Sequence, residues 1–271
     1  MPNTETDQRI DALLAQMTLE EKISLAAGSD AWHTTPVSRV GVPRIKVTDG
    51  PNGARGSNFI GTTSACFPCG TALGATWDPE LVRLVGAAIG REARSKQARV
   101  LLAPTMNIHR HPLAGRNFEC PSEDPFLTAR IVVGYIEGVQ SQRVAATAKH
   151  FVCNDSEFER MTISSEVSER ALREIYLPPF EAAVKEAGTW AVMSSYNRIN
   201  GTHACNNADL LTTILKDEWG FDGLVMSDWW GTRSTIRAAN AGLDLEMPGP
   251  GHHFGARLNE SVASGQVSGA V

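Results

Sequence analysis

The chain has 271 residues and a mass of 29.2 kDa, which fits one (β/α)8 barrel of about 250 residues as well as it fits two small domains, and we prefer one domain. Its formal net charge of -5 and the lack of any Lys/Arg run exclude a nucleic-acid partner, which a basic surface would bind. No segment reaches the ~18 apolar residues of a membrane span, and the polar, acidic residues 1–7 do not resemble a signal peptide. We therefore expect one cytoplasmic domain over residues 1–271, with no membrane partner.

Two helices are predicted before the first strand. Apolar residues recur with helical spacing over residues 7–17, and Thr18 and Glu21 form a capping box for a second helix that ends at Gly28. We expect these helices to plug or flank the main domain.

From residue 45 the chain alternates between short apolar runs and amphipathic segments. The predicted strands are 45–49, 100–105, 144–148, 190–195, 223–227 and 243–249, with a weaker one at 72–75. The predicted helices are 78–97, one from Pro125, 168–187 with a break at Pro178 and Pro179, 207–219, 232–241 and 254–265, and residues 267–271 look like the cap of another. Such alternation predicts a parallel sheet covered by helices.

Polar residues follow the ends of several predicted strands: Asp49, Lys149, His150, Tyr196 and Asp228. A barrel brings all of its strand ends to one pocket, whereas an open sheet would use only two or three of them. The turn after the first strand also lacks the G-x-G-x-x-G of a dinucleotide site. We therefore predict an α/β fold, a TIM-like (β/α)8 barrel that is irregular or incomplete toward its C-terminal end.

Neither a metal nor a cofactor is predicted. The five cysteines are scattered and odd in number, which argues against a disulfide framework. Cys66 and Cys69 form a C-x-x-C pair, but no second pair completes a zinc site. His109 and His111 lack a third ligand, so hydrogen bonds to loop backbone explain them better than a metal does.

Two long polar loops, 107–124 and 153–165, supply further candidates, because long loops in compact domains usually serve function. Arg116 and Arg160 either bind a ligand or form structural ion pairs with the acidic residues of their own loops, Glu119 and Glu157.

Lys149, at a strand end, has two interpretations. It is a Schiff-base lysine if desolvation lowers its pKa, or a hydrogen-bond donor to a sugar hydroxyl. Both remain open from the residues alone.

Asp228 follows the apolar run 223–227 and precedes Trp229 and Trp230. A carboxylate beside indole rings suits a sugar-cleaving pocket, where flat apolar faces meet the pyranose and an anion meets the oxocarbenium-like centre. The alternative is that Asp228 only caps the next helix.

Five motifs in this order resemble the N-terminal barrel of glycoside hydrolase family 3 β-glucosidases, and together they cover nearly the whole chain. They are Asp49-Gly-Pro-x-Gly53, Gly115-Arg-Asn-Phe-Glu119, Lys149-His150-Phe151, Ser194-Ser-Tyr-Asn197 and Ser227-Asp-Trp229. The loop 151–157 lacks the Gly-His-Gly-Asp pattern of the family's N-acetylhexosaminidases, so that branch is not favoured.

The resemblance implies a retaining β-glucosidase that acts on a β-glucoside or short oligosaccharide, with Asp228 as the nucleophile. It implies that the hydroxyls of the terminal glucosyl unit are held by Asp49, Arg116, Lys149, His150, Arg160 and Tyr196. It also implies that the pocket is completed by Arg55, Met193 and Trp229. If close, Lys149 and Arg160 would keep Asp228 ionised.

The acid/base of this family usually comes from an α/β sandwich domain after the barrel, against which we expect this domain to pack. Glu246, at the last predicted strand end, is the candidate substitute within the chain. The other hypotheses are a β-xylosidase-type activity, a non-catalytic sugar-binding barrel and a Schiff-base lyase that uses Lys149.

Overall fold

A parallel five-stranded sheet forms the centre of the molecule. The computed structural model describes residues 4–56 and 62–269. The sheet order is β10-β7-β5-β4-β3, and all pairs are parallel. Its strands are β3 (Val47–Asp49), β4 (Val100–Leu102), β5 (Ala145–Phe151), β7 (Ala191–Ser194) and β10 (Leu224–Ser227). Neighbouring strands are thus successive in the chain, as in a barrel.

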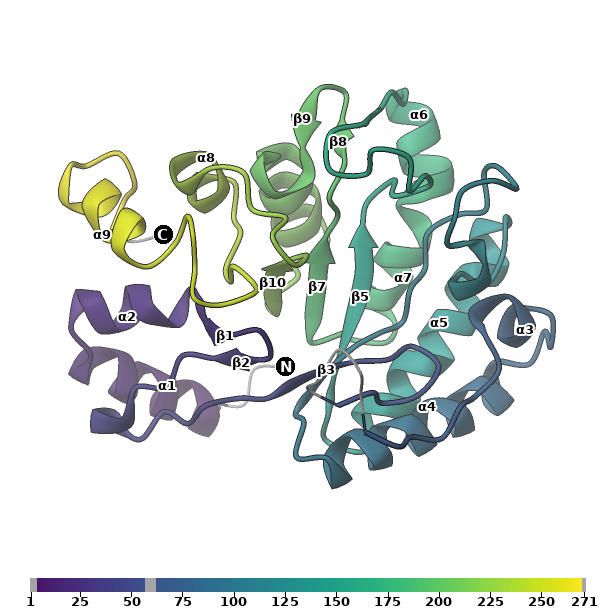
Figure 1. Ribbon diagram of the computed structural model, residues 1–271, viewed down its shortest axis with the longest axis horizontal. Coiled ribbons are helices and arrows are strands. Elements are labelled where there is room, and N and C mark those ends of the chain that lie inside the picture. Colours follow the sequence, from purple (N-terminus) through teal and green to yellow (C-terminus); the bar gives the residue numbers. More distant parts are fainter. Residues whose placement is uncertain (1–3, 57–61, 270–271) are drawn as a thin grey trace.

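Helices follow the strands of the sheet, and the long ones cover its outer face (Figure 1). They are α3 (Gly70–Gly74), α4 (Pro79–Ser95), α5 (Pro125–Gln140), α6 (Glu169–Ala171), the π-helical η3 (Leu172–Tyr176), α7 (Pro178–Lys185), the π-helical η5 (Asp209–Glu218), α8 (Thr235–Asn240) and α9 (Ala256–Ala263). Asp78 and Asp124 cap α4 and α5, each followed by proline at the first helical position.

The N-terminal part lies beside α9 (Figure 1). It contains α1 (Thr4–Gln16), α2 (Leu19–Leu25) and the hairpin of β1 (Gly28–Asp30) and β2 (His33–Thr34). The predicted capping box at the start of α2 is present.

Short segments continue the ring of backbone hydrogen bonds from β10 back to β3. The Ser227 N–H donates to the Leu245 carbonyl at 2.9 Å, and the Gly28 N–H donates to the Glu246 carbonyl at 3.0 Å. On the other side of the hairpin, the Val47 N–H donates to the Trp32 carbonyl at 2.8 Å. The barrel is therefore closed by isolated bridges and a hairpin in place of three regular parallel strands.

Alternating residues of the strands face two separate cores. Val192 and Val225 belong to the large core between sheet and helices, while their neighbours Met193 and Met226 belong to a smaller core inside the ring. A strand with both faces buried reads as a continuous apolar run, which is why these segments were recognisable from the sequence.

The predicted fold class is confirmed, with the irregularity on the side of the last strand. The strand predicted at 72–75 is wrong, because residues 72–74 belong to α3 and Ala75 is its C-cap. Gly70 and Gly74, one helical turn apart, let this helix lie directly on the backbone of Glu119 and Pro121. The segment 243–249 forms isolated bridges at Leu245 and Glu246 instead of a regular strand.

The other helical predictions agree with the structure within a few residues. The break in 168–187 falls between η3 and α7, before Pro178. Residues 270–271 of the predicted last cap lie outside the described residues. Within the described ranges, no helix is long and apolar enough to span a bilayer.

A second small sheet, of β6 (Ser164–Ser165), β8 (Arg198–Ile199) and β9 (Thr202–His203), joins the loops that follow β5 and β7. It fixes the loops that follow two strands of the main sheet, at the edge where the polar residues emerge.

Candidate active site

A cavity of about 340 Å³ lies at the carboxyl ends of the parallel strands. It is lined by all ten residues singled out from the sequence: Asp49, Arg55, Arg116, Lys149, His150, Arg160, Met193, Tyr196, Asp228 and Trp229. Among the described residues, Trp32, Leu102, Glu119 and Trp230 also line it. The structure thus brings the predicted residues together, while their individual roles stay predictions.

Strand register explains why these distant residues meet. Lys149 in β5 pairs with Met193 in β7, and Ser194 pairs with Ser227, the residue before Asp228. Asp49, at the end of β3, pairs with Leu102 of β4. Each side chain therefore leaves the sheet at the same edge.

Asp228 is almost completely buried at the inner end of the cavity. Its Oδ1 accepts a hydrogen bond from the Trp229 N–H at 2.7 Å, and its Oδ2 lies 3.5 Å from His150 Nε2. Helix α8 is instead capped by Ser234, so the alternative that Asp228 caps this helix is wrong.

The pKa of Asp228 is raised, mainly because burial disfavours the charged carboxylate. Lys149 and Arg116 act in the opposite direction, as does the Tyr196 hydroxyl. The expected effect of Lys149 is thus present, but burial outweighs it.

Asp49 is the centre of an ion-pair cluster. Lys149 Nζ donates to Asp49 Oδ1 at 3.0 Å, and Arg55 Nη2 donates to Oδ2 at 3.1 Å. Burial alone would raise the pKa of Asp49, but the two cations outweigh burial and lower it. The ion pair also places Lys149 as a hydrogen-bond donor, which disfavours its use as a Schiff-base nucleophile.

The ion pairs considered for Arg116 and Arg160 are both present, while their role in ligand binding stays a prediction. Arg116 forms a two-pronged ion pair with Glu119, at 2.8 and 2.9 Å, and Arg160 Nη1 lies 2.7 Å from Glu157. Both arginines nevertheless line the cavity. Bidentate pairing fixes the plane of a guanidinium, so its remaining N–H groups point in defined directions.

Aromatic rings form one wall of the cavity. Trp229 packs against Trp32 with ring centroids 5.4 Å apart, and its Nε1 donates to the Ala31 carbonyl at 3.0 Å. The Arg160 guanidinium lies 4.7 Å from the Tyr196 ring centroid. Such rings offer apolar faces to the C–H groups of a pyranose.

Trp32 and Leu102 were missed by the sequence reasoning. Trp32 lies in the hairpin that closes the ring, before the first parallel strand, so no strand-end rule could place it. Leu102 is an ordinary apolar strand residue. Only the pairing of Asp49 with Leu102 brings it to the cavity.

The remaining candidates lie elsewhere. His109 Nε2 is within 2.9 Å of two backbone carbonyls, and His111 Nδ1 accepts from the Leu113 N–H. Within the described ranges, no group of three His, Cys, Asp or Glu side chains is arranged to hold a metal ion. Glu246 accepts hydrogen bonds from the backbone N–H groups of residues 252–254 and does not line the cavity.

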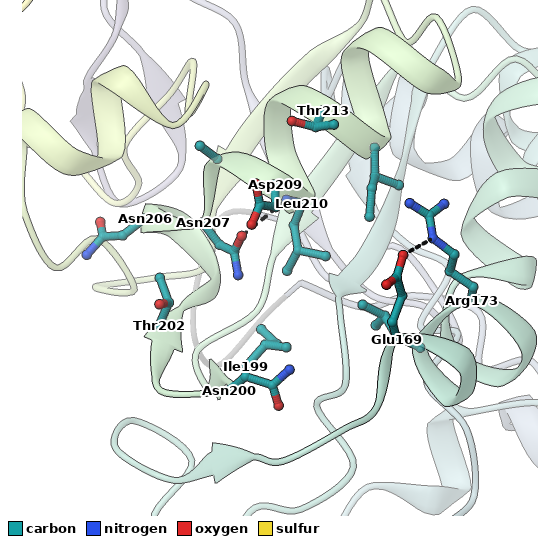
Figure 2. A pocket seen from close by; sticks show the side chains of 13 residues that line it. Glu169, Arg173, Ile199, Asn200, Thr202, Asn206, Asn207, Asp209, Leu210 and Thr213 are labelled. Carbon is teal, nitrogen blue, oxygen red and sulfur yellow. Dashed lines mark hydrogen bonds and ion pairs between the residues drawn. The ribbon is translucent and has the colours of Figure 1, made fainter.

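A larger cavity, of about 510 Å³, lies between α6, η3 and η5 (Figure 2). Its floor includes Leu172, Ile199 and Leu210, and its charged rim residues Glu169 and Arg173 are paired with each other at 3.2 Å. It lacks the buried carboxylates and indole rings of the strand-end cavity, so we do not assign the chemistry to it.

Fold and cavity together define a class: a TIM-like α/β barrel with a polar, aromatic-lined cavity at the carboxyl ends of its strands. Residues 14–270 match the model of the glycosyl hydrolase family 3 N terminal domain. The chain therefore belongs to glycosyl hydrolase family 3, which confirms the resemblance seen in the motifs.

Similar proteins agree with this assignment. The chain is 63% identical to a β-glucosidase of Rhizobium radiobacter over 260 residues, which are 95% of this chain and 32% of that protein. It is 57% identical to β-glucosidase B of Emericella nidulans, over 89% of this chain and 29% of that protein. The chain thus spans about a third of the length of the curated relatives it matches.

Solved structures show the same fold. A β-glucosidase of Kluyveromyces marxianus in complex with glucose matches with a TM-score of 0.93 and 46% identity, over 95% of this chain and 31% of that chain. β-Glucosidase 3B of Thermotoga neapolitana in complex with α-D-glucose matches with a TM-score of 0.91 and 41% identity, over 96% of this chain and 40% of that chain.

Proposed function

We propose that the chain is the catalytic barrel of a retaining β-glucosidase, in which Asp228 attacks the anomeric carbon of a terminal β-D-glucosyl residue. The observation that carries this proposal is the position of Asp228, buried in a strand-end cavity among cations and indole rings. The relatives above are β-glucosidases, and two of the matching structures contain glucose, which supports glucose as the sugar.

The reaction has two steps in this proposal. A carboxylate oxygen of Asp228 forms a bond to C1 while the bond from C1 to the leaving oxygen breaks, and an acid gives that oxygen a proton. Water then attacks C1 of the glycosyl ester and loses a proton to the group that acted as the acid in the first step and now acts as a base. Asp228 leaves as the carboxylate, and the sugar keeps its configuration.

The other lining residues would hold the sugar. A glucosyl ring presents several hydroxyls, and each one buried without a partner costs about 1–3 kcal/mol. The Asp49–Lys149 pair offers a charged acceptor and a charged donor at 3.0 Å from each other, and charge-assisted hydrogen bonds are the stronger kind. The remaining hydroxyls would form hydrogen bonds with Arg116, Arg160 and Tyr196.

The acid/base is proposed to come from outside these 271 residues. Besides Asp228, the carboxylates that line the cavity are Asp49 and Glu119, and neighbouring cations lower the pKa of both, although burial opposes this. Groups so strongly ionised are poor proton donors. A following α/β sandwich domain that packs on the barrel would supply the acid, in keeping with relatives about three times as long.

Substitution of the nucleophile tests the proposal. In the intact protein, Asp228→Ala should lower nitrophenol release from an aryl β-glucoside by roughly 10³-fold or more, because the first bond to C1 can no longer form. Asp209→Ala, which removes an exposed carboxylate from the larger cavity in Figure 2, is the matched control and should keep turnover. Near-normal turnover in Asp228→Ala would end the proposal. If kcat/KM is higher for the aryl β-xyloside than for the aryl β-glucoside, the protein is a β-xylosidase-type enzyme of the same family.

A non-catalytic sugar-binding barrel is the second candidate, favoured by the ionised state of the other cavity carboxylates. It predicts that the intact protein binds glucose in a calorimeter without releasing nitrophenol from any aryl glycoside.

A further inference from the structure

Asn107 holds the backbone of His150 from both sides. Its Nδ2 donates to the His150 carbonyl at 2.9 Å, and its Oδ1 accepts from the His150 N–H at 3.0 Å. Both residues are buried. Asn107 follows β4 in a segment that runs beside β5, where the Met106 N–H donates to the Lys149 carbonyl at 2.8 Å.

These two bonds fix the orientation of the Asn107 amide. A backbone N–H can only donate and a backbone carbonyl can only accept, so the amide cannot be flipped without losing both bonds. The atom that faces the imidazole is therefore Oδ1, which lies 3.3 Å from His150 Nδ1. Because Oδ1 is an acceptor, Nδ1 must carry the ring hydrogen.

The other ring nitrogen then has a lone pair and faces the cavity. Arg116 Nη1 lies 3.3 Å from Nε2 and can donate to it. Asp228 Oδ2 lies 3.5 Å from the same nitrogen. Two acceptors make no hydrogen bond, and within the described part of the chain no donor meets hydrogen-bond geometry at Oδ2. The Tyr196 hydroxyl is the other group that interacts with the Asp228 carboxylate, and it lowers the pKa of that carboxylate.

We propose that Asn107 is a positioning residue that holds His150 in the Nδ1–H tautomer, so that the adjacent Asp228 oxygen stays free to attack. This inference rests on the proposed function and adds a residue to it that touches neither sugar nor carboxylate. In the opposite tautomer an Nε2–H would donate to Asp228 Oδ2, stabilise its lone pair and weaken it as a nucleophile. A protonated ring would do the same.

The surroundings of His150 favour the neutral ring. Burial lowers the pKa of His150 well below its usual value, and so do three neighbouring cations: Arg116, Lys149 and Arg160. Within the described residues, Asp228 is the carboxylate within ion-pair distance of the ring. Asp155 lines a small cavity together with Asn107 and His150, and burial raises the pKa of Asp155 to about 7. Glu119 and Glu157 lie behind Arg116 and are paired with it.

Asn107→Asp tests the proposal through the pH profile. A carboxylate beside Nδ1 would stabilise the imidazolium and raise the pKa of His150, so the inactive, protonated ring would persist to higher pH. The acid limb of kcat/KM should then move up by about one pH unit, as expected for a new charge within contact distance. A merely structural role would lower stability or activity at every pH without moving the limb.

Two controls separate this effect from other causes of a shifted acid limb. Asn200 makes the same pair of backbone bonds to Val167, at 2.8 and 2.9 Å, and lines the cavity of Figure 2 far from any imidazole of the site. Asn200→Asp should keep the native pH profile. The new charge could also act on Asp228 directly, so Asn107→Asp is repeated in a His150→Gln background, where no comparable shift is expected.

An acid limb that does not move, or the same shift with and without the imidazole, overturns the proposal.

If Asn107→Asp does not fold, Asn107→Ser replaces it. In Asn107→Ser, kcat should fall about fivefold with KM nearly unchanged, which corresponds to the loss of one hydrogen bond. A native kcat in this variant contradicts the proposal. If the native protein hydrolyses no glycoside, the proposed function fails first. The same variants are then compared by the pH dependence of glucose binding, where an unmoved midpoint overturns the tautomer proposal.

Discussion

Two aspartates of the cavity show how local charge sets protonation. Asp49 contacts both Lys149 and Arg55, and its pKa is lowered despite burial. Within the described residues, no Lys or Arg lies within ion-pair distance of Asp228, whose nearest titratable neighbour is the neutral His150 ring, and burial raises the pKa of Asp228. The proposed nucleophile is therefore the carboxylate of the pair that titrates at higher pH.

This difference predicts a pH dependence. Asp228 must be ionised and the His150 ring beside it neutral for the attack, so kcat/KM should fall where this interacting pair takes up a proton, as the pH drops through the raised pKa of Asp228. Lys149→Met removes a cation that lowers this pKa, so the proton is held more tightly and the acid limb should move to higher pH by about one unit.

The control for this prediction is another Lys–Asp pair. Lys216 lies 2.7 Å from Asp244, away from the cavity lining, so Lys216→Met should leave the limb in place. An acid limb that stays fixed or moves down in Lys149→Met would show that the pKa of Asp228 does not set it.

At this scale the sequence located most of the cavity. Asp49, Lys149, Tyr196 and Asp228 each follow an apolar run, and the common edge of a parallel sheet brings such residues together. Asn107 could not be recognised, because its importance depends on the orientation of its amide, and neighbouring residues in the sequence do not determine that.

Helices α4 and α5 approach each other through glycines. A Cβ on Gly138 would overlap the Arg83 carbonyl oxygen and lie 2.8 Å from the Ala87 nitrogen, and Gly86 and Gly134 meet backbone in the same way. This contact holds two of the helices that cover the sheet, so the glycines determine how closely that layer packs.

Gly138→Val should therefore lower the free energy of unfolding by about 1–3 kcal/mol or more, the usual cost of overpacking. Chemical denaturation of the intact protein measures it. Glu137→Ala, at an exposed position of the same helix, should change stability by less than about 0.5 kcal/mol. Equal stability of the two variants would mean that the helices separate without cost.

Helix could be distinguished from strand where apolar residues recur with regular spacing over many residues. The segment 78–97 is such a case, and Asp78 and Pro79 mark its start. The distinction failed at 72–75, because a short run of small residues has no distinctive period. There a tertiary contact, the close approach of Gly70 and Gly74 to another backbone, decides in favour of helix.

On the scale of the whole molecule, the barrel depends on a few residues that close its ring. Glu246 contributes twice: its backbone joins residues 26–28, and its carboxylate accepts from the N–H groups of residues 252–254. The sequence did not predict this closure, because isolated bridges involve too few residues to form a pattern.

Glu246→Gln should lower the free energy of unfolding of the intact protein by about 1–3 kcal/mol. The amide replaces one of the two accepting oxygens with an NH2 donor, which then faces backbone N–H groups that are donors themselves. Turnover per folded molecule should stay within a few-fold of native. Glu186→Gln, in an exposed ion pair with Arg130, should have little effect on either quantity. Full stability combined with lost turnover would instead assign the acid role to Glu246.

The central claim is that Asp228 bonds to the sugar. The most direct measurement is to trap the intact protein with a 2-fluoro β-glucoside, whose glycosyl ester hydrolyses slowly, and to map the labelled peptide by mass spectrometry. The account predicts one added fluoroglucosyl mass on the peptide that contains Asp228, localised to that residue. A label on Asp49, Glu119 or any other carboxylate would contradict it.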